Sequence, residues 1–281
     1  VASDGPEKFS LREFPHGTTL DHRDRLDAVQ RELREFPGVS VLIYEQTCAT
    51  EKRRRRKRGR LAEPDRRVLV NDRVCEGCGD CGVQSNCLSV VPLETEFGRK
   101  RAIDQSACNK DYSCLKGFCP SFVTVHGVVP AKPAGVNAQG AQVPLPVPQL
   151  PDTAEPYRML IAGIGGMGVV TVSALLGTAA HLEGKASLLI DDTGLAQKFG
   201  AVYSHIQIAD KAESLHAPRI GVAGADLIVG PDLVTAASEK VLPKVAPGRT
   251  LAVVNTHEQV TGAFTRNPDL QVPGSDLRGT I

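Results

Sequence analysis

The chain has 281 residues, enough for roughly two domains of ~100–200 residues each. Its 33 Lys and Arg residues nearly balance 32 Asp and Glu residues, and a net charge of +1 creates no overall field that would select nucleic acid or an acidic membrane. It contains no run of about 18 apolar residues, and VASDGPEKFS at its start lacks the features of a signal peptide. We therefore expect a cytoplasmic protein whose eight cysteines bind metal rather than form disulfides. Because the chain starts without Met, we also expect it to be a piece of a longer protein.

The first predicted elements are a helix over residues 20–36 and a strand over residues 39–44. The helix has apolar residues at steps of three and four, namely Leu26, Val29, Leu33 and Phe36. The strand, VSVLIY, is apolar and rich in β-branched residues, which predicts that it is buried. A helix followed by a strand is half of a βαβ unit, and residues 1–60 are too few to bury a sheet. This segment is therefore expected to be the end of an α/β domain.

A strongly basic run, EKRRRRKRGR, follows at residues 51–60. Its eight basic side chains could form a nucleic-acid or localisation patch, or a solvated face that contacts a partner or another part of a larger chain. No aromatic residue is interleaved to stack on bases, so the run favours the solvated face over nucleic acid. Cys48, just after the predicted strand, is expected to be a small buried residue.

Seven of the eight cysteines lie within residues 68–127. The first run, CEGCGDCGVQSNC, has the C-x2-C-x2-C spacing with which bacterial ferredoxin motifs begin. Three thiolates at that spacing can surround one face of an iron–sulfur cube, whereas paired CxxC knuckles would suit zinc. Small residues between them allow a tight turn and direct amides at the sulfurs: Gly77, Gly79 and Gly82.

The second run, CNKDYSCLKGFCPS, departs from this spacing at one position. Cys108 and Cys114 are six apart, like the first and third ligands of the first run, but the middle position is Asp111. The run ends in the Cys-Pro pair expected of a fourth ligand. In two-cluster ferredoxins the fourth cysteine of each run binds the other cluster. The spacing therefore predicts two ligand sets: Cys75, Cys78, Cys81 and Cys119 for the first cluster, and Cys108, Asp111, Cys114 and Cys87 for the second.

The number of clusters depends on Asp111. A carboxylate is a harder donor than a thiolate and should hold iron less firmly, so the second cluster is expected to be labile or partly a three-iron form. Alternatively, Asp111 is an ordinary loop acid, one cluster forms, and Cys87, Cys108 and Cys114 are buried or unligated thiols. Zinc is the third possibility.

Two further segments complete this part of the chain. VVPLETEFGRKRAID, between the two cysteine runs, predicts a hairpin that joins two pseudo-symmetric halves. Its basic residues, Arg99, Lys100 and Arg101, either raise the potential of a cluster or are solvated loop charges. Residues 128–156 contain seven prolines and no apolar period, which predicts a stiff, extended linker.

From Tyr157 onward, alternating strand-like and helix-like runs predict an open α/β sheet. An apolar strand leads into a glycine-rich turn that consists of Gly163, Gly165, Gly166 and Gly168. A helix follows, and a second strand, ASLLID, ends in two acids, Asp191 and Asp192. This order is that of a dinucleotide-binding fingerprint, and free amides at the start of the helix could bind a phosphate group. The alternative is a tight β–α turn that packs against a neighbour.

The remaining elements follow from local pattern. Further strands are predicted at residues 201–209, 225–230 and 250–255, with a helix over DLVTAASEKVLPKV between the last two. The helix after the glycine-rich turn is expected to bury one side that includes Val170, Ala174 and Leu175. The expected fold class is a multidomain α/β protein: a ferredoxin-like iron–sulfur insert, then an open α/β domain with a Gly-rich β–α turn.

Several stretches together resemble the fused indolepyruvate ferredoxin oxidoreductases, members of the 2-oxoacid:ferredoxin oxidoreductase family. They are GVSVLIYEQTCATEKRRRRKRG, the two cysteine runs, and GIGGMGVVT with DDTGLAQKFGAVYSHIQIA. The resemblance implies four parts. These are the end of a thiamine diphosphate domain (1–60), a ferredoxin-like 4Fe-4S domain (61–127), the linker (128–156) and the start of a pyruvate/ketoisovalerate oxidoreductase gamma-type catalytic domain (157–281).

The resemblance also implies a reaction, the oxidative decarboxylation of aryl 2-oxoacids. A thiamine ylid attacks the 2-oxo carbon, carbon dioxide leaves, and clusters remove the two remaining electrons singly. Ferredoxin is the implied electron acceptor, and coenzyme A takes the acyl group. The G-D-G and N-N motif expected to bind magnesium and the diphosphate is not found, so these residues should not catalyse the full reaction alone. The remaining domains of the parent chain, within a homo-oligomer, are the implied partners.

Catalytic residues are not determined by these patterns. Polar residues of the resembling stretch follow a strand end and could reach a site; they are Thr193, Gly194, Gln197, Lys198, Ser204 and His205. His205 is alternatively a hydrogen-bonded strand histidine. Two other functions remain open: an electron-transfer and docking module without its own catalytic site, and a nicotinamide-dependent iron–sulfur reductase. The absence of a recognisable flavin motif argues against the reductase, because nicotinamide gives two electrons and clusters accept one.

Overall fold

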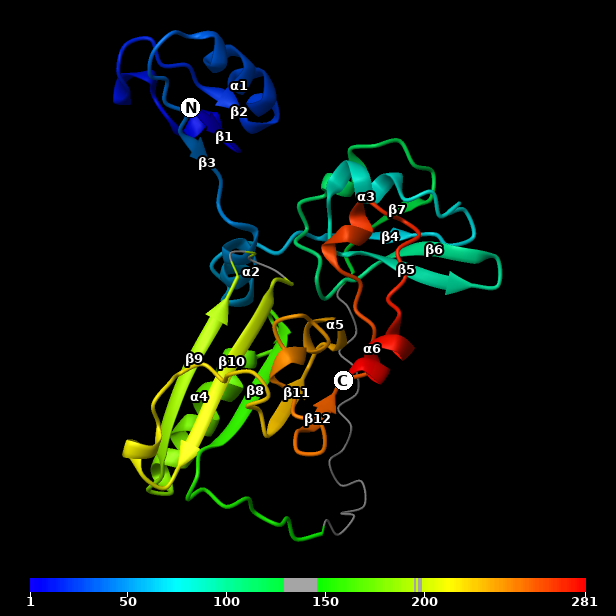
Figure 1. Ribbon diagram of the computed structural model, residues 1–281. Helices are drawn as coiled ribbons and strands as arrows, with labels where there is room; N and C mark the ends of the chain where they lie inside the picture. Colours follow the sequence, from blue (N-terminus) through cyan, green and yellow to red (C-terminus); the bar gives the residue numbers. More distant parts are fainter. Residues whose placement is uncertain (129–145, 195, 197–198) are drawn as a thin grey trace. The chain divides into compact units, whose positions relative to one another are not determined.

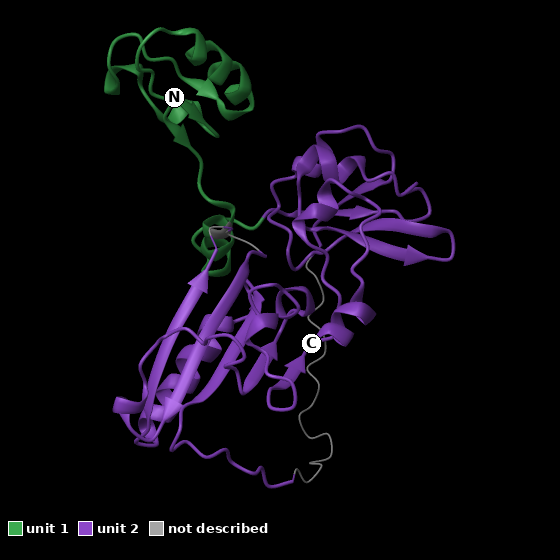
Figure 2. Cartoon of the chain, in the orientation of Figure 1, with its two compact units in different colours: residues 1–63 green, residues 64–281 purple. Residues whose placement is uncertain are grey.

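The computed structural model describes residues 1–128, 146–194, 196 and 199–281. These residues form two compact units, Val1–Glu63 and Pro64–Ile281 (Figures 1 and 2). Most of the predicted linker lies outside the described residues. No helix within the described ranges has the length and apolar character needed to cross a lipid bilayer.

The first unit contains a small parallel sheet with the strand order β2-β1-β3. Its strands are β1 (Ala2–Ser3), β2 (Asp21–His22) and β3 (Tyr44–Glu45). Its helices are η1 (Pro6–Lys8), η2 (Leu11–Glu13), η3 (Arg23–Arg25), α1 (Leu26–Glu35) and α2 (Ala49–Lys57).

The predicted helix is present as η3 and α1, but the predicted buried strand is wrong. Val39 is 97% exposed and Val41 is 75% exposed, and pairing begins only at Tyr44. An apolar run predicts a buried strand only where a second layer covers it, and no described element covers this one. Cys48, expected to be buried, is exposed instead.

The basic run forms most of α2. Part of its charge is used within the unit: Glu51 pairs with Arg55 at 3.0 Å, and Lys52 pairs with Asp4 at 2.9 Å. The Glu51–Arg55 pair supports the solvated face as the role of the run, because exposed helical ion pairs are common and contribute little stability. The Lys52–Asp4 pair is a partly buried contact with the start of the chain.

The cysteine-rich part of the second unit consists of two antiparallel strand pairs. β4 (Arg66–Val70) pairs with β7 (Phe122–His126), and β5 (Val90–Thr95) pairs with β6 (Gly98–Ile103). The β5–β6 pair confirms the predicted hairpin. Two short helices, α3 (Asp80–Ser85) and η4 (Ser113–Leu115), follow the starts of the two cysteine runs.

The rest of the second unit contains a mixed five-stranded sheet with the order β12-β11-β8-β10-β9 (Figure 1). Its strands are β8 (Tyr157–Ile164), β9 (Ala186–Thr193), β10 (Ala201–Ala209), β11 (Leu227–Gly230) and β12 (Leu251–Val254). β10 is antiparallel to both of its neighbours, and the other pairs are parallel. The predicted open α/β sheet is therefore confirmed, with one antiparallel strand inserted between β8 and β9. The side chains of β8 and β10 contribute to both of the sheet's hydrophobic cores.

The helix after the glycine-rich turn, α4 (Val169–Leu182), buries a different side from the predicted one. Its buried residues are Val169, Ser173, Gly177 and Ala180. Leu175, expected inside, is 65% exposed, and Val170 and Ala174 also lie outside. The helix is apolar on all sides, so the pattern could not indicate which side faces the sheet.

The predicted helix after β11 is reduced to α5 (Leu233–Ala236) and a later turn, η6 (Leu242–Lys244). Asp232 caps α5 by accepting a hydrogen bond from the Thr235 amide at 2.7 Å. Pro243 disfavours an α-helix that continues through this residue, because proline has no amide proton to donate and its ring clashes with the preceding turn, but it does not explain why α5 already ends at Ala236. A further short turn, η5 (Ala212–Ser214), follows β10.

The end of the chain contains η7 (Gly262–Thr265) and α6 (Gly274–Thr280). Residues 264–270, called the C-terminal strap below, contact the cysteine-rich part. Thr265 Oγ1 donates to Asn86 Oδ1 at 2.9 Å, and Arg99 Nη1 donates to the Leu270 carbonyl at 2.8 Å. The second unit therefore joins residues that are more than 150 positions apart in the sequence.

Candidate metal centre

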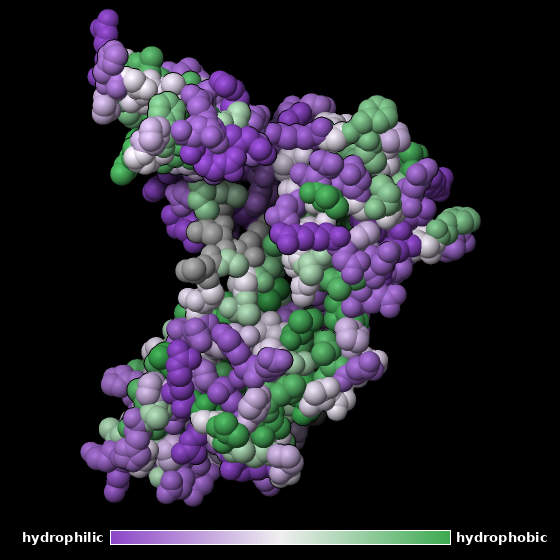
Figure 3. Space-filling model, turned by 45° about the horizontal axis from the view of Figure 1, so that its top comes forward, coloured by the Kyte–Doolittle hydropathy of each residue, from purple (hydrophilic) through white to green (hydrophobic). Residues whose placement is uncertain are grey.

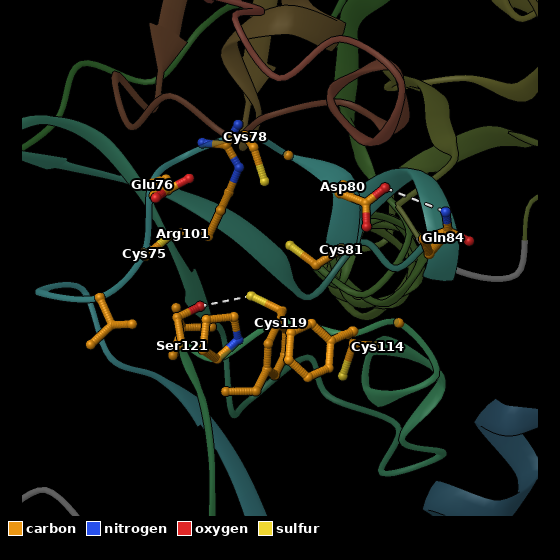
Figure 4. A pocket seen from close by; sticks show the side chains of 17 residues that line it. Cys75, Glu76, Cys78, Asp80, Cys81, Gln84, Arg101, Cys114, Cys119 and Ser121 are labelled. Atoms are coloured by element: carbon orange, nitrogen blue, oxygen red, sulfur yellow. Dashed lines mark hydrogen bonds between the residues drawn. The ribbon is translucent and has the colours of Figure 1, made fainter.

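Five cysteines line one cavity of about 210 Å³ in the cysteine-rich part (Figure 4). Four are the first predicted ligand set, Cys75, Cys78, Cys81 and Cys119, and the fifth is Cys114 of the second set. The β4–β7 pairing brings them together, since Val70 lies opposite Phe122 and the Asn71 amide donates to the Ser121 carbonyl at 2.7 Å. The first three predicted ligands and the crossing Cys-Pro cysteine thus share one site, although they lie at opposite ends of the segment.

Local hydrogen bonds hold the cavity wall. The Gly77 amide donates to Cys75 Sγ at 3.4 Å, and Cys119 Sγ lies 3.0 Å from the hydroxyl of Ser121, which is buried. Burial raises the pKa of the Cys81 thiol, and the nearby Arg101 charge opposes that shift. A group of partly buried thiols is stabilised in its ionised form when a metal-containing core replaces their protons.

Arg101 also lines this cavity. Its side chain is 2% exposed, and Arg101 is the only buried Lys or Arg within the described residues. It donates to two backbone carbonyls, those of Lys100 at 3.0 Å and Pro268 at 3.1 Å, and it lies 4.8 Å from the centre of the Phe264 ring. No carboxylate of the described part of the chain pairs with it. A buried positive charge without an anionic partner is costly, so the site suits a negatively charged occupant.

The second predicted ligand set also gathers in one place. Burial, together with Cys87, Cys108 and Asp111, raises the pKa of Cys114 to about 12. All three neighbours belong to the predicted second set. Cys114 also lines the first cavity, so the two sets are adjacent.

The two cysteine loops have the same local conformation. Gly77 and Gly79, on either side of Cys78, have φ angles of +75° and +80°. Their counterparts 33 positions later, Lys110 and Tyr112, have φ angles of +57° and +60° on either side of Asp111.

The amide of each loop's third residue donates to the sulfur of its first: the Lys110 amide lies 3.4 Å from Cys108 Sγ, as in the first loop. Left-handed backbone is unfavourable for a lysine or tyrosine, so the second loop retains the shape of the first at an energetic cost. Asp111 therefore occupies the position that corresponds to Cys78.

Asp111 is exposed, and its Oδ1 accepts hydrogen bonds from the amide and hydroxyl of Ser113 at 3.1 and 2.9 Å. A carboxylate has two oxygens with several acceptor sites, so these bonds do not prevent metal ligation.

The donor set, thiols beside a buried guanidinium, has the chemistry of an iron–sulfur site. Among the described residues, no three His, Cys, Asp or Glu side chains converge as ligands of one metal ion. A tetrahedral zinc would require its thiolates to be about 3.8 Å apart, given Zn–S bonds of about 2.3 Å. Thiols spread around a cavity wall, next to a buried guanidinium, fit a larger anionic core.

The glycine-rich turn is largely explained by packing. The Gly165 amide donates to the Gly200 carbonyl at 2.8 Å, and the Met167 amide to the Ile164 carbonyl at 3.1 Å. A Cβ at Gly163 would lie 2.9 Å from a methyl group of Val169. Gly166 and Gly168 have φ angles of +105° and +82°, so the turn requires glycine at these two positions. These contacts support the tight β–α turn, and phosphate binding by this turn stays a prediction.

The predicted dinucleotide fingerprint does not form as a unit. β10 lies between β8 and β9, so the acids that end β9 are two strands, about 10 Å, from the strand that carries the turn. Asp191 accepts a hydrogen bond from Ser204, and Asp192 pairs with Arg219 at 3.1 Å. The sequence order alone could not reveal the inserted strand.

The six catalytic candidates differ in position. Ser204 and His205 are buried in β10, where His205 Nδ1 accepts a hydrogen bond from the Ile220 amide at 3.1 Å. Burial lowers the pKa of His205 to about 4. These features are those of a hydrogen-bonded strand histidine. Thr193 and Gly194 are exposed, and Gln197 and Lys198 lie outside the described residues.

Comparisons with known proteins find oxidoreductases that are similar to part of the chain. Residues 158–278 match the model of the pyruvate ferredoxin/flavodoxin oxidoreductase family. Indolepyruvate oxidoreductase subunit IorB of Archaeoglobus fulgidus is 30% identical over 125 residues, which cover 43% of this chain and 59% of that protein. The subunit of the same name from Methanothermobacter thermautotrophicus is 25% identical over 125 residues, covering 44% and 60%. The chain thus spans about three fifths of the length of these relatives.

A solved structure shows a weaker likeness. Pyruvate oxidoreductase subunit PORC from Thermotoga maritima is 19% identical, with a TM-score of 0.30 over 41% of this chain and 56% of that one, so no conclusion rests on it. The family match and the IorB relatives agree with the resemblance seen in the sequence. Residues 158–278 thus match an oxoacid:ferredoxin oxidoreductase family, and the IorB subunits are similar to part of this chain.

Proposed function

We propose that this chain is the electron-transfer part of an indolepyruvate-type 2-oxoacid:ferredoxin oxidoreductase, and that it binds two iron–sulfur clusters. The observation that carries the proposal is the shared cavity of Cys75, Cys78, Cys81 and Cys119. Such clusters, when bound, transfer single electrons. The protein residues supply the thiolates, the amide that bonds to Cys75 and a buried positive charge.

The second site is proposed to take Cys87, Cys108, Cys114 and Asp111. Two observations support this set. Cys87, Cys108 and Asp111 all raise the pKa of Cys114, and Asp111 lies in a loop whose φ angles resemble those around Cys78. Because a carboxylate is a harder donor than a thiolate, the iron next to Asp111 should be the most readily lost. A partly three-iron form of this cluster is the expected consequence.

The experiment that tests the function is anaerobic reconstitution with iron and sulfide, followed by measurement of both elements per chain. We expect two iron–sulfur clusters and two interacting paramagnets in the electron paramagnetic resonance spectrum of the reduced protein. Cys81→Ser should abolish one of them, whereas Cys48→Ser, in the first unit, should leave both unchanged. A colourless protein that binds zinc would refute the proposal.

Asp111 can be tested separately. We expect Asp111→Ala to lose one iron or the whole second cluster, and Asp111→Cys to make that cluster resistant to iron loss. Asp80→Ala is the matched control, because Asp80 lies in the first loop, bonds to Gln84, and is not a predicted ligand. Iron content after exposure to a chelator measures the difference. An alanine variant that keeps both clusters would remove Asp111 from the ligand set.

The chemistry of the parent enzyme is proposed from the relatives. It is the thiamine-dependent conversion of an aryl 2-oxoacid to its acyl-CoA, with ferredoxin as the acceptor. Indolepyruvate is the expected substrate, given the names of the IorB relatives. The full-length parent with thiamine diphosphate and coenzyme A should bleach its clusters when an arylpyruvate is added. Bleaching by NADH alone would instead favour a nicotinamide-dependent reductase, for which the separated acids of β9 offer no support.

A further inference from the structure

Arg101 combines features that the set of metal ligands alone does not explain. It is a cation on β6 and is 2% exposed. It lines the cavity that contains the first predicted ligand set, Cys75, Cys78, Cys81 and Cys119. Its partners among the residues that the structure describes are all neutral: two backbone carbonyls and the ring of Phe264. Because an unpaired buried charge is strongly unfavourable, the position is best explained by an anion on the cavity side.

Arg99, on the same strand, offers a comparison because it is paired with a carboxylate. Its side chain is 22% exposed and pairs with Glu94, and it does not line the cavity. Like Arg101, it donates to a carbonyl of the C-terminal strap, that of Leu270. Two arginines therefore bind the same strap, but only Arg101 lacks a carboxylate in the described part of the chain.

The strap fits closely against the first cysteine loop. A Cβ at Gly79 would lie 2.5 Å from Pro268 Cβ and 3.3 Å from Arg101 Nη2. A Cβ at Gly82 would lie 3.3 Å from the Thr265 carbonyl oxygen. The glycines of the first run therefore leave room for the strap as well as for the turn.

We propose that Arg101 is the counter-charge of the first cysteine site and that the C-terminal strap positions its guanidinium there. The proposal rests on the iron–sulfur function proposed above. A cluster bound by four thiolates is negatively charged, and a nearby positive charge favours the additional electron of the reduced form. Residues 264–270, which lie within the family-matched region, would thus adjust the potential of a cluster bound some 150 positions earlier in the chain.

The test is a redox titration of the full 281-residue chain, monitored by electron paramagnetic resonance after anaerobic reconstitution. We expect Arg101→Gln to shift the midpoint potential of one cluster to more negative values and to leave the other largely unchanged. Arg101→Lys, which keeps the charge, should shift it by less. Arg99→Gln, the matched control, should leave both potentials unchanged. Thr265→Val, which removes the strap's bond to Asn86, should shift the same signal as Arg101→Gln, by a smaller amount.

Other results would contradict the role of the Arg101 charge, the role of the C-terminal strap or the proposed function. Unchanged potentials in Arg101→Gln, or equal shifts in the Gln and Lys variants, would overturn the role of the charge. An unchanged potential in Thr265→Val would overturn the role of the strap. If Arg101→Gln lost the first cluster while Arg101→Lys kept it, the counter-charge would be supported, whereas loss from both would indicate a packing role and overturn it. A wild-type chain that takes up no iron would refute the proposed function itself.

Discussion

At the scale of single residues, Gly77 of the first cysteine run is required by the nearby backbone of β6 as well as by the conformation of its own turn. Gly77 has a φ of +75°, and a Cβ there would lie 2.2 Å from the Arg99 carbonyl oxygen. Gly98, in the hairpin turn, has a φ of +90°, but a Cβ there would meet nothing within 4 Å. A substitution at either glycine would strain the backbone, because both have a positive φ. Only a substitution at Gly77 would also clash with the Arg99 carbonyl oxygen.

This pair gives a direct prediction. Both Gly77→Ala and Gly98→Ala should lose about 1–2 kcal/mol from left-handed strain. Gly77→Ala should lose a further ~1–3 kcal/mol, because the β6 backbone must move away from the added methyl. Thermal unfolding of the reconstituted variants measures the difference. Equal losses in the two variants would contradict the contact between Gly77 and Arg99.

His205 predicts how the stability of the sheet depends on pH. Burial, together with the charges of Lys244 and Arg219, lowers its pKa to about 4, and Asp192 opposes this shift. In the unfolded chain the pKa is near 6.5, so between about pH 6.5 and 4 the unfolded state binds more protons than the folded state. The stability from neutral His205 is therefore present above pH 6.5 and is lost as the pH falls, by roughly 3 kcal/mol at most.

His205→Asn isolates this effect. The asparagine side-chain oxygen can still accept the hydrogen bond from the Ile220 amide, but asparagine has no group that titrates in this pH range. Hydrogen exchange of the β8 and β10 amides, measured from pH 7 to 5, should show a loss of protection in the wild type that is smaller in the variant. Identical pH dependence in both proteins would show that His205 does not control it.

At the scale of elements, the prediction that matters most concerns which side of α4 faces the sheet. Val169→Ala should destabilise the protein by roughly 1–3 kcal/mol, since Val169 is buried in a core cluster. Leu175→Ala, on the side expected from the sequence to be buried, should change the stability by less than about 0.5 kcal/mol. Urea unfolding compares the two. A larger loss for Leu175→Ala would mean that the outer side of α4 packs against something in this chain.

The bounds of some elements could be predicted from the sequence, but their arrangement in the sheet could not. β10 was predicted with its observed bounds and the hairpin was located correctly, because alternating β-branched strands and a short Gly-containing turn are local signals. Tertiary arrangement was not predictable in this way. The insertion of β10 between β8 and β9 separates two parts of a fingerprint that are close in the sequence.

The candidate site shows the same division. Cysteine spacing and the crossover rule predicted two ligand sets. The first set lines one cavity, but Cys114 of the second set lines it too, so the assignment of ligands to clusters stays a prediction. The burial of Arg101 and its contact with Pro268 depend on residues 167 positions apart, and no local pattern contains that information.

At the scale of the whole molecule, apolar side chains remain at the surface of both units. In the first unit they include Val39 and Val41, and in the second Leu175 and Leu182 of α4 and Leu251 of β12. Apolar (green) residues are among those at the surface in the view of Figure 3. Exposed apolar patches often mark interaction sites. Such surfaces are what the proposed function, as one part of a larger enzyme, would require.

The division into two units leads to the last prediction. All eight predicted ligands, Arg101 and the C-terminal strap lie in Pro64–Ile281. A fragment of residues 64–281 should therefore take up as much iron as the full chain and show the same two potentials. A second fragment, residues 1–261, keeps every predicted ligand but loses the contacts of Phe264, Thr265 and Pro268 with the cysteine-rich part. We expect it to hold the first cluster less firmly, with faster iron loss to a chelator. If residues 64–281 failed to bind iron while the full chain succeeded, the first unit would be part of the metal centre. The assignment of iron binding to Pro64–Ile281 alone would then be wrong.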